Sequence, residues 1–292
     1  MTTTIVLFLI ATIAGSTIQF ASNKEYSRFF PSDFHGMVLF DGIALSSTAI
    51  ACLCAGGGVL PSKTTTFLFL IYGPLFVTTI MLMLKVMSMG PLGASSLIIN
   101  MSMMIPSAAG ILLWGEKLTV TVGIGIVCMI LVLVLSSFEG GGKRANIKWL
   151  LLALLTMVFN GILCIVCEFF PRLTEGESEF VFLFWSFLFA SLICWTTVFI
   201  LHKKGKDYSP WKKKPLPLIG TALGVGLGTA ANNGFAQLLM PLVDAVILFP
   251  LIQGSTVLIL CLVSITVYKD KVTLTGTLAL ILGIAGIILL SI

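Results

Sequence analysis

Uncharged amide side chains interrupt several long apolar stretches of this sequence. They are Asn100, Asn160, Asn232, Asn233, Gln237 and Gln253. An amide donates and accepts hydrogen bonds without carrying a charge, so a group of amides suits a polar organic solute. The same side chains can instead join neighbouring helices, each hydrogen bond being worth about 0.6 kcal/mol in a membrane. Four different stretches carry amides at similar depth, which favours a solute-binding site.

Two charged residues, Asp41 and Lys85, also lie inside apolar stretches, where a charge is costly. Counted from the same membrane side, both lie at a comparable depth. Two interpretations stay open: a structural ion pair whose Lys85 reaches towards the membrane surface, or an Asp41 that takes up a proton or a cation during transport. Glu168 and Asp244 lie near the opposite face, where we expect both to contact water.

Most of the aromatic residues are expected to face lipid or to pack inside the protein. Tyr72 and Trp185 are the two candidates for stacking on a bound solute.

Small residues and prolines mark places where helices approach each other or bend. Gly220, Gly224 and Gly228 recur every fourth residue on one helix face, which is the pattern of closely packed membrane helices. Pro106 and Pro250 interrupt two other apolar stretches, where they predict kinks.

The sequence lacks the residue patterns that would indicate catalysis, a cofactor or a metal. The two histidines, His35 and His202, lie in or beside expected loops, and the seven cysteines fall in apolar runs, where they act as small packing residues. There is no phosphate-binding GxxxxGK[ST] loop, no HExxH and no GxSxG. We therefore expect no enzymatic activity, no catalytic residues, no cofactor and no metal ion.

The chain that must position the polar groups has the composition of a membrane protein. Of its 292 residues, 58% are hydrophobic and 10% are charged, with a mean hydropathy of +1.10, whereas soluble domains carry about 25% charge. A spanning helix needs about 20 largely apolar residues. The segments that qualify are 3–20, 34–58, 65–89, 92–114, 118–137, 148–169, 179–201, 216–239, 242–267 and 272–291. We expect an all-α integral membrane protein with ten transmembrane helices.

Lysine and arginine are divided unequally between the two ends of these segments. Fourteen of the 17 basic residues fall on one side. They are Lys24, Arg28, Lys85, Lys143, Arg144, Lys148, Lys203, Lys204, Lys206, Lys212, Lys213, Lys214, Lys269 and Lys271. The positive-inside rule places that side in the cytoplasm, so we expect both termini outside it and the cell membrane as the location. The basic stretch HKKGKDYSPWKKK is interpreted as an anchor on anionic lipid rather than as a nucleic-acid site.

The two halves of the chain repeat a short pattern. The first reads WGEKLTVTVGIGIVCMILVLVLSS and the second VYKDKVTLTGTLALILGIAGIILLSI. Aligning Glu116 with Asp270 also pairs a lysine and a threonine that follow each acid. Five helices per half is an odd number, so the predicted halves, 1–140 and 141–292, insert in opposite directions. Many secondary transporters use such inverted repeats, with the substrate site near the membrane midplane.

The acidic-basic hinge followed by a threonine and a glycine-spotted apolar helix resembles the EamA repeat. Two such repeats in ten helices resemble the drug/metabolite transporter (DMT) superfamily, and the resemblance covers nearly the whole chain. It implies ten helices around a central cavity, with 118–137 and 272–291 at the periphery. Many members of that superfamily keep their termini in the cytoplasm, whereas the basic residues of this chain predict the opposite.

These features predict a secondary active transporter that works by alternating access on a small polar organic metabolite, such as an amino acid, a nucleoside or a sugar. Its energy would come from a gradient or from exchange, because no ATP-binding loop is present. The expected partners are the solute, protons or a counter-substrate, and the lipid bilayer, but no nucleic acid. The alternative is a membrane channel or scaffold without coupled transport.

Overall fold

The computed structural model describes residues 3–31, 33–115, 119–121, 123–125, 127–128, 131, 147–174, 176–268 and 274–290. Within these residues every regular element is helical and no strand occurs. Five helical segments are long and apolar enough to cross a membrane: Thr3–Phe29, Phe34–Gly57, Lys63–Met89, Ile147–Leu173 and Glu179–Lys203. The expectation of an all-α chain with membrane-type helices is therefore confirmed for the described residues.

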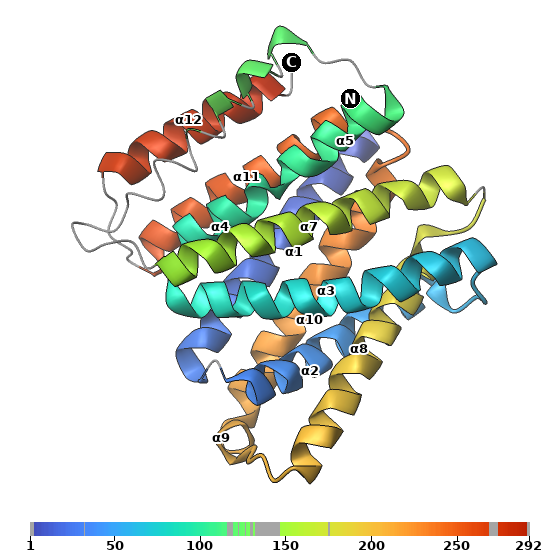
Figure 1. Ribbon diagram of the computed structural model, residues 1–292, viewed down its shortest axis with the longest axis vertical. Helices are drawn as coiled ribbons and strands as arrows, with labels where there is room; N and C mark the ends of the chain where they lie inside the picture. Colours follow the sequence, from blue (N-terminus) through green and yellow to red (C-terminus); the bar gives the residue numbers. More distant parts are fainter. Residues whose placement is uncertain are drawn as a thin grey trace. The chain divides into compact units, whose positions relative to one another are not determined.

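The helices follow the expected apolar segments (Figure 1). In chain order they are α1 (Thr3–Phe29), α2 (Phe34–Cys52), η1 (Leu53–Gly57), α3 (Lys63–Met89), α4 (Leu92–Asn100), η2 (Met101–Met103), α5 (Met104–Trp114), α7 (Ile147–Leu173), α8 (Glu179–Lys203), α9 (Ser209–Lys212), α10 (Pro215–Leu239), α11 (Ala245–Thr266) and α12 (Leu274–Leu290). Most of the expected segment 118–137 lies outside the described residues, as do Glu116, Lys117, Asp270, Lys271 and Thr273 of the repeated hinge. Ten spans and an inverted repeat stay predictions.

Helix α1 continues well beyond the segment 3–20 that hydrophobicity alone marks. Its last turns contain polar residues, yet Asn23 and Tyr26 are fully buried there. The ring of Tyr26 stacks on Phe40 of α2 with centroids 3.9 Å apart, and Lys24 Nζ donates to the Met87 carbonyl of α3 at 3.2 Å. Tertiary packing thus extends the helix through residues that a hydropathy window excludes.

The expected segment 92–114 is helical throughout, but it is not one continuous α-helix. A 3-10 turn, η2, separates α4 from α5. Pro106 explains this position, because proline has no N–H to donate and its ring clashes with the carbonyl four residues earlier, here that of Ser102. The proline therefore bends the chain just before itself, at the polar residue Ser102.

The described chain divides into two compact units, each considered by itself. Unit 1 comprises the described residues of Met1–Ser88 and Val166–Leu239, and unit 2 those of Met89–Ile165 and Met240–Ile292. In unit 1, α1 packs along α10, and α2 packs along both α8 and α10. In unit 2, α11 packs against α4, α5 and α12.

Helices α1 and α10 approach each other so closely that their backbones touch. A Cβ atom on Gly15 would lie 2.6 Å from the Asn232 nitrogen, and one on Gly228 would lie 2.7 Å from the Gly15 carbonyl oxygen. Gly224 lies against the side chain of Ser22 of α1. Small residues allow this approach, as the spacing of the glycines on α10 predicted.

One member of that glycine pattern does not take part in the contact. A Cβ atom on Gly220 would meet nothing within 4 Å, whereas Gly226, which lies outside the four-residue pattern, packs against Ala44 and Ser47 of α2. The expected single stripe is therefore wrong at Gly220. Gly220 faces open space, and α2 makes its own close contact with α10 at Gly226.

The substitutions Gly228→Ala and Gly220→Ala test the close contact of α1 and α10. Gly228→Ala places a methyl group against backbone atoms that cannot rotate away, so we expect a loss of about 1–3 kcal/mol in stability. Gly220→Ala enters open space and gains helix propensity, up to about 1 kcal/mol. Thermal unfolding of the purified protein in detergent should rank Gly220→Ala at or above wild type and Gly228→Ala below it; equal midpoints would contradict the contact.

Candidate functional site

Buried Tyr72 of α3 and half-buried Asn233 of α10 form a polar contact in unit 1. The Tyr72 hydroxyl donates to Asn233 Oδ1 at 3.1 Å, and Asn233 Nδ2 donates to the Thr229 carbonyl at 2.9 Å. Phe76 stacks on the Tyr72 ring at 5.6 Å, and Phe182 of α8 meets it edge-on at 5.3 Å. Tyr72 is 1% exposed. It therefore presents a hydrogen-bonding group within an aromatic wall and does not face lipid.

A polar stripe on α10 extends this contact. Thr229, Asn233 and Gln237 are spaced four residues apart, so they share one face of the helix. Gln237 Nε2 donates to a backbone carbonyl of α7 at 3.4 Å. Gln237 Oε1, Thr229 Oγ1 and the hydroxyl of Ser186, on the α8 turn that packs near Tyr72, are buried and have no hydrogen-bond partner among the described residues. This cluster retains hydrogen-bonding capacity.

Asn232 belongs to a different face of α10 from its neighbour. Its backbone nitrogen lies against Gly15 of α1, and successive helical residues are rotated by about 100°. The structure therefore brings the Asn233 side chain to Tyr72, whereas the described contact of Asn232 is that of its backbone with α1. The sequence alone does not distinguish the two asparagines.

Trp185 supports a loop of unit 1. Its indole N–H donates to the Val59 carbonyl at 2.8 Å, in the connection between η1 and α3. Its ring stacks near Phe69 at 6.1 Å. Trp185 thus ties α8 to that connection, and the described contacts do not join it directly to Tyr72.

In unit 2, Ser102 joins two of the expected amides. Asn160 Nδ2 donates to Ser102 Oγ at 2.7 Å, and Ser102 Oγ donates to Gln253 Oε1 at 2.9 Å. Gln253 Nε2 in turn points to Cys164 Sγ at 3.8 Å. The relay links α7, η2 and α11, so these two amides do meet, through a serine that the sequence did not single out.

Asn100 behaves differently from the other amides of unit 2. It is buried, but its Nδ2 donates to the Ser96 carbonyl one turn earlier at 2.8 Å. This bond helps to satisfy the amide within its own helix. None of the hydrogen bonds described for the relay of Asn160, Ser102 and Gln253 includes Asn100.

Asp41 is a fully buried acid near the beginning of α2. Its exposed fraction is 0%, and neither carboxylate oxygen makes a hydrogen bond to any described residue, Lys85 included. Asn23 of α1 is also fully buried, and its amide has no hydrogen-bond partner among the described residues. The direct Asp41–Lys85 contact that was one interpretation of the sequence is absent here. Asn23 was missed because the first span was expected to end at residue 20.

Two other acids differ in their surroundings. Asp244, which precedes α11, is exposed as expected. Glu168 is 1% exposed, so the expectation that it contacts water is wrong. Its carboxylate accepts hydrogen bonds from Arg172, one turn later on α7, at 2.8 and 3.3 Å. The sequence does contain a signal for this pair, because an arginine four residues after an acid lies on the same face of a helix and can pair with it.

Glu177 joins the α7–α8 connection to the beginning of α3. It accepts hydrogen bonds from the Ser62 backbone N–H at 3.0 Å and from the Thr65 hydroxyl at 2.6 Å. Partial burial opposes ionisation, but these hydrogen bonds outweigh it and hold the pKa of Glu177 below its usual range. The ionised Glu177 carboxylate therefore holds the α7–α8 connection against the beginning of α3.

Within the described residues, no three His, Cys, Asp or Glu side chains gather in a group that could hold a metal ion. The polar clusters consist of amides and hydroxyls, which suit hydrogen bonding to an uncharged or zwitterionic solute.

Comparison with known proteins supports the fold without naming a family. No family model and no curated protein matches the sequence. Among solved structures 28 chains match. One, titled "Crystal structure of protein", has a TM-score of 0.63 and 17% sequence identity, over 100% of this chain and 99% of its own. At that identity the likeness shows a shared fold alone.

The substitutions Ser102→Ala and Ser107→Ala test the relay of unit 2. Ser102→Ala leaves the half-buried side chain of Asn160 and the buried side chain of Gln253 without their shared partner, so we expect a loss of about 1–3 kcal/mol in stability. Ser107, five residues later, is also buried but has no hydrogen-bond partner among the described residues. Ser107→Ala should be neutral or stabilising. Unfolding midpoints of the two variants measure this, and a Ser102→Ala midpoint at or above that of Ser107→Ala would contradict the relay.

Proposed function

We propose that this chain is a secondary active transporter of a small polar organic solute, neutral or zwitterionic, and that it belongs among the EamA-type members of the DMT superfamily. The doubled hinge in the sequence and the all-helical fold with membrane-type helices support this proposal. The substrate classes are amino acids, nucleosides and sugars.

One observation carries the proposal most directly. In unit 1, Asn233 and Gln237 of α10 and Tyr72 of α3 bring uncharged hydrogen-bonding groups into an aromatic interior, and Gln237 Oε1 has no partner among the described residues. A buried polar atom without a partner costs about 1–3 kcal/mol. A solute that bonds to it would recover that cost. Sites for small molecules combine apolar walls with a few polar groups in this way.

We propose Asp41 as the residue that couples transport to a proton or another cation. A buried acid without a hydrogen-bond partner among the described residues does not contribute to stability in the way that a paired acid does. Ionisable residues inside membrane helices commonly mark ion or proton pathways. Alternating access would then expose Asp41 to each side of the membrane in turn.

The basic residues support an orientation with loop 204–208 and its neighbouring lysines in the cytoplasm and both termini outside it. The cell membrane is the proposed location. Antibody access to terminal tags on intact cells tests this part separately.

Counterflow in proteoliposomes tests the function itself. Vesicles preloaded with unlabelled neutral amino acids, nucleosides or hexoses are diluted into trace labelled solute of the same kind. A carrier gives transient, saturable accumulation of at least one class. Flux that rises linearly with concentration and without counterflow would indicate a channel, and the absence of flux for every class would indicate a scaffold; either result would overturn the proposal.

Tyr72→Phe tests the proposed site with whichever solute gives counterflow. The variant keeps the ring and removes the hydroxyl that bonds to Asn233. We expect about a tenfold loss in solute affinity and a loss of about 1 kcal/mol in stability, because Asn233 Oδ1 loses this donor. Thr78→Val is the control, because Thr78 is exposed on the same helix and its hydroxyl bonds only to the Pro74 carbonyl among described residues. Equal affinities in the two variants would exclude Tyr72 from the site.

Asp41→Asn tests the coupling. Exchange of labelled for unlabelled solute requires no net proton movement, so we expect it to continue, whereas accumulation driven by a pH gradient should be lost. Glu25→Gln, which removes an acid paired with Arg28 on the surface of α1, should leave both unchanged. Accumulation by Asp41→Asn at the wild-type rate and with the wild-type pH dependence would contradict the role of Asp41.

A further inference from the structure

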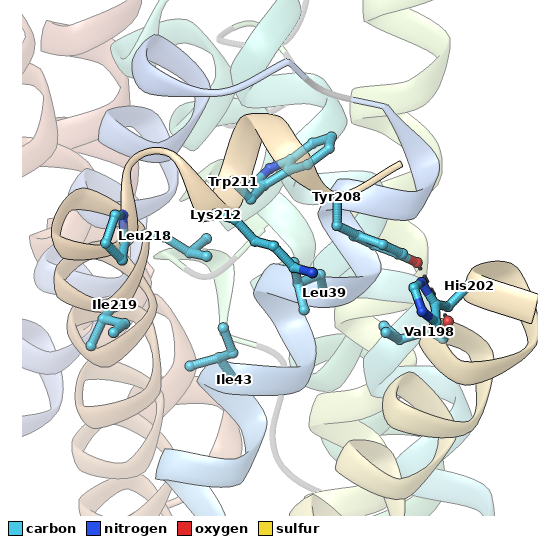
Figure 2. A pocket seen from close by; sticks show the side chains of 10 residues that line it. Leu39, Ile43, Val198, His202, Tyr208, Trp211, Lys212, Leu218 and Ile219 are labelled. Carbon is cyan, nitrogen blue, oxygen red and sulfur yellow. Dashed lines mark hydrogen bonds between the residues drawn. The ribbon is translucent and has the colours of Figure 1, made fainter. Parts of the chain in front are cut away.

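A pocket lies in unit 1 beside the basic stretch that follows α8. Its volume is about 460 Å³. Leu39 and Ile43 of α2 form one part of its apolar lining, and Leu218 and Ile219 of α10 form another. Figure 2 shows Lys212 extending between the α10 side chains and the pair Tyr208 and His202. The pocket thus combines an apolar interior with a cation at its mouth.

The short helix α9 is fixed in place, and Lys212 with it. Trp211 is 1% exposed, and its indole N–H donates to the Tyr26 hydroxyl of α1 at 3.0 Å. Its ring covers Gly36 at the beginning of α2, where any Cβ would collide with it. The neighbouring Lys212 is exposed. The buried tryptophan therefore holds the lysine over the pocket.

The surroundings of the pocket mouth are strongly basic. Residues 202–214 contain six lysines and one acid, Asp207. The Asp207 carboxylate accepts hydrogen bonds from the Ser209 backbone N–H at 2.8 Å and from the Ser209 hydroxyl at 2.6 Å, which hold its pKa below the usual range. One acid against six lysines leaves a positive field that favours an anion.

The pocket also lies where a membrane surface is expected. Its lining comes from the last turn of α8, which is of membrane-spanning length and composition, from the first turns of α10 and from α2. A ligand with a long apolar part and an anionic head would match both the lining and the charge. Anionic phospholipids have this chemistry, and basic pockets between membrane helices bind their headgroups.

We propose that this pocket binds an anionic phospholipid of the adjoining leaflet, with part of an acyl chain between α2 and α10 and the headgroup phosphate against Lys212. Lys213 lies next to Lys212 in sequence and adds to the positive field, but of these two lysines only Lys212 lines the pocket. The site uses residues outside the Tyr72 cluster and does not require that the protein transports a solute.

The test measures thermal stability of the full chain after purification in detergent and removal of lipid. Dioleoyl phosphatidylglycerol, dioleoyl phosphatidylcholine and inorganic phosphate are added in separate titrations. A ligand that binds the folded protein raises its unfolding temperature with concentration. We expect a saturable rise with phosphatidylglycerol, a much smaller one with phosphatidylcholine and none with phosphate.

Two pairs of variants locate the effect. Lys212→Gln should weaken the apparent affinity for phosphatidylglycerol about fivefold, whereas Lys213→Gln, the same charge change on a residue that does not line the pocket, should change it less than about twofold. Ile219→Trp fills the pocket from a half-exposed position and should abolish the rise. Leu216→Trp, on an exposed α10 residue outside the lining, should retain it.

Three results would overturn the proposal. Equal stabilisation by the two phospholipids would show that charge is not selected. Equal stabilisation by inorganic phosphate would show that no acyl chain is needed. Equal effects of Lys212→Gln and Lys213→Gln would indicate diffuse attraction to the basic stretch and no defined pocket.

Discussion

The backbone contact between α1 and α10 is the constraint on which the interior of unit 1 depends. Gly15 and Gly228 allow the two helices to touch, and no side chain larger than hydrogen fits there without displacing backbone. The contact fixes the rotation of α10 about its axis. The backbone nitrogen of Asn232 lies against Gly15 of α1, and the next residue, Asn233, is rotated by about 100° and reaches Tyr72. The polar stripe of α10 therefore has its direction because two glycines permit the approach.

The two units use uncharged polar groups in different ways. In unit 2, Ser102 receives a hydrogen bond from Asn160 and gives one to Gln253, so the relay ties three helical segments together. In unit 1, the cluster of Tyr72 and Asn233 retains buried polar atoms without a partner among the described residues. A satisfied network specifies packing, whereas an unsatisfied one has the capacity to bind a ligand. This difference gives the Tyr72 cluster of unit 1 more free hydrogen-bonding capacity than the relay of unit 2.

Hydrophobicity and polarity predicted much of the fold. An apolar run of about 20 residues can span a membrane, and there the helix is one of the few structures that satisfy its backbone hydrogen bonds. The helical segments and the presence of buried amides follow from that rule. What it cannot supply is the direction of each side chain. Asn232 and Asn233 look equivalent in the sequence, yet the described hydrogen bond to Tyr72 is that of Asn233. Asn100 looks like Asn160, yet its side chain bonds to a carbonyl of its own helix.

Tertiary contacts also extend helices beyond what composition marks. The last turns of α1 contain lysine, glutamate and serine. The contacts of Tyr26 with Phe40 and Trp211 and the hydrogen bond of Lys24 to the Met87 carbonyl hold these turns against the rest of unit 1. Asn23 was overlooked for that reason. Ser102 was overlooked for another: serines are common in membrane helices and usually bond to their own backbone, so only the bend that precedes Pro106 distinguishes this one.

The two buried acids of unit 1 show why Asp41 differs from a structural charge. Glu168 has Arg172 one turn away on the same helix, and the two side chains meet at 2.8 Å. That pairing offsets much of the cost of burial. Asp41 is more completely buried and makes no hydrogen bond to any described residue, so stability alone would favour an uncharged side chain at its position. This contrast is the structural basis for proposing Asp41, and not Glu168, as the acid that takes up and releases a proton or a cation.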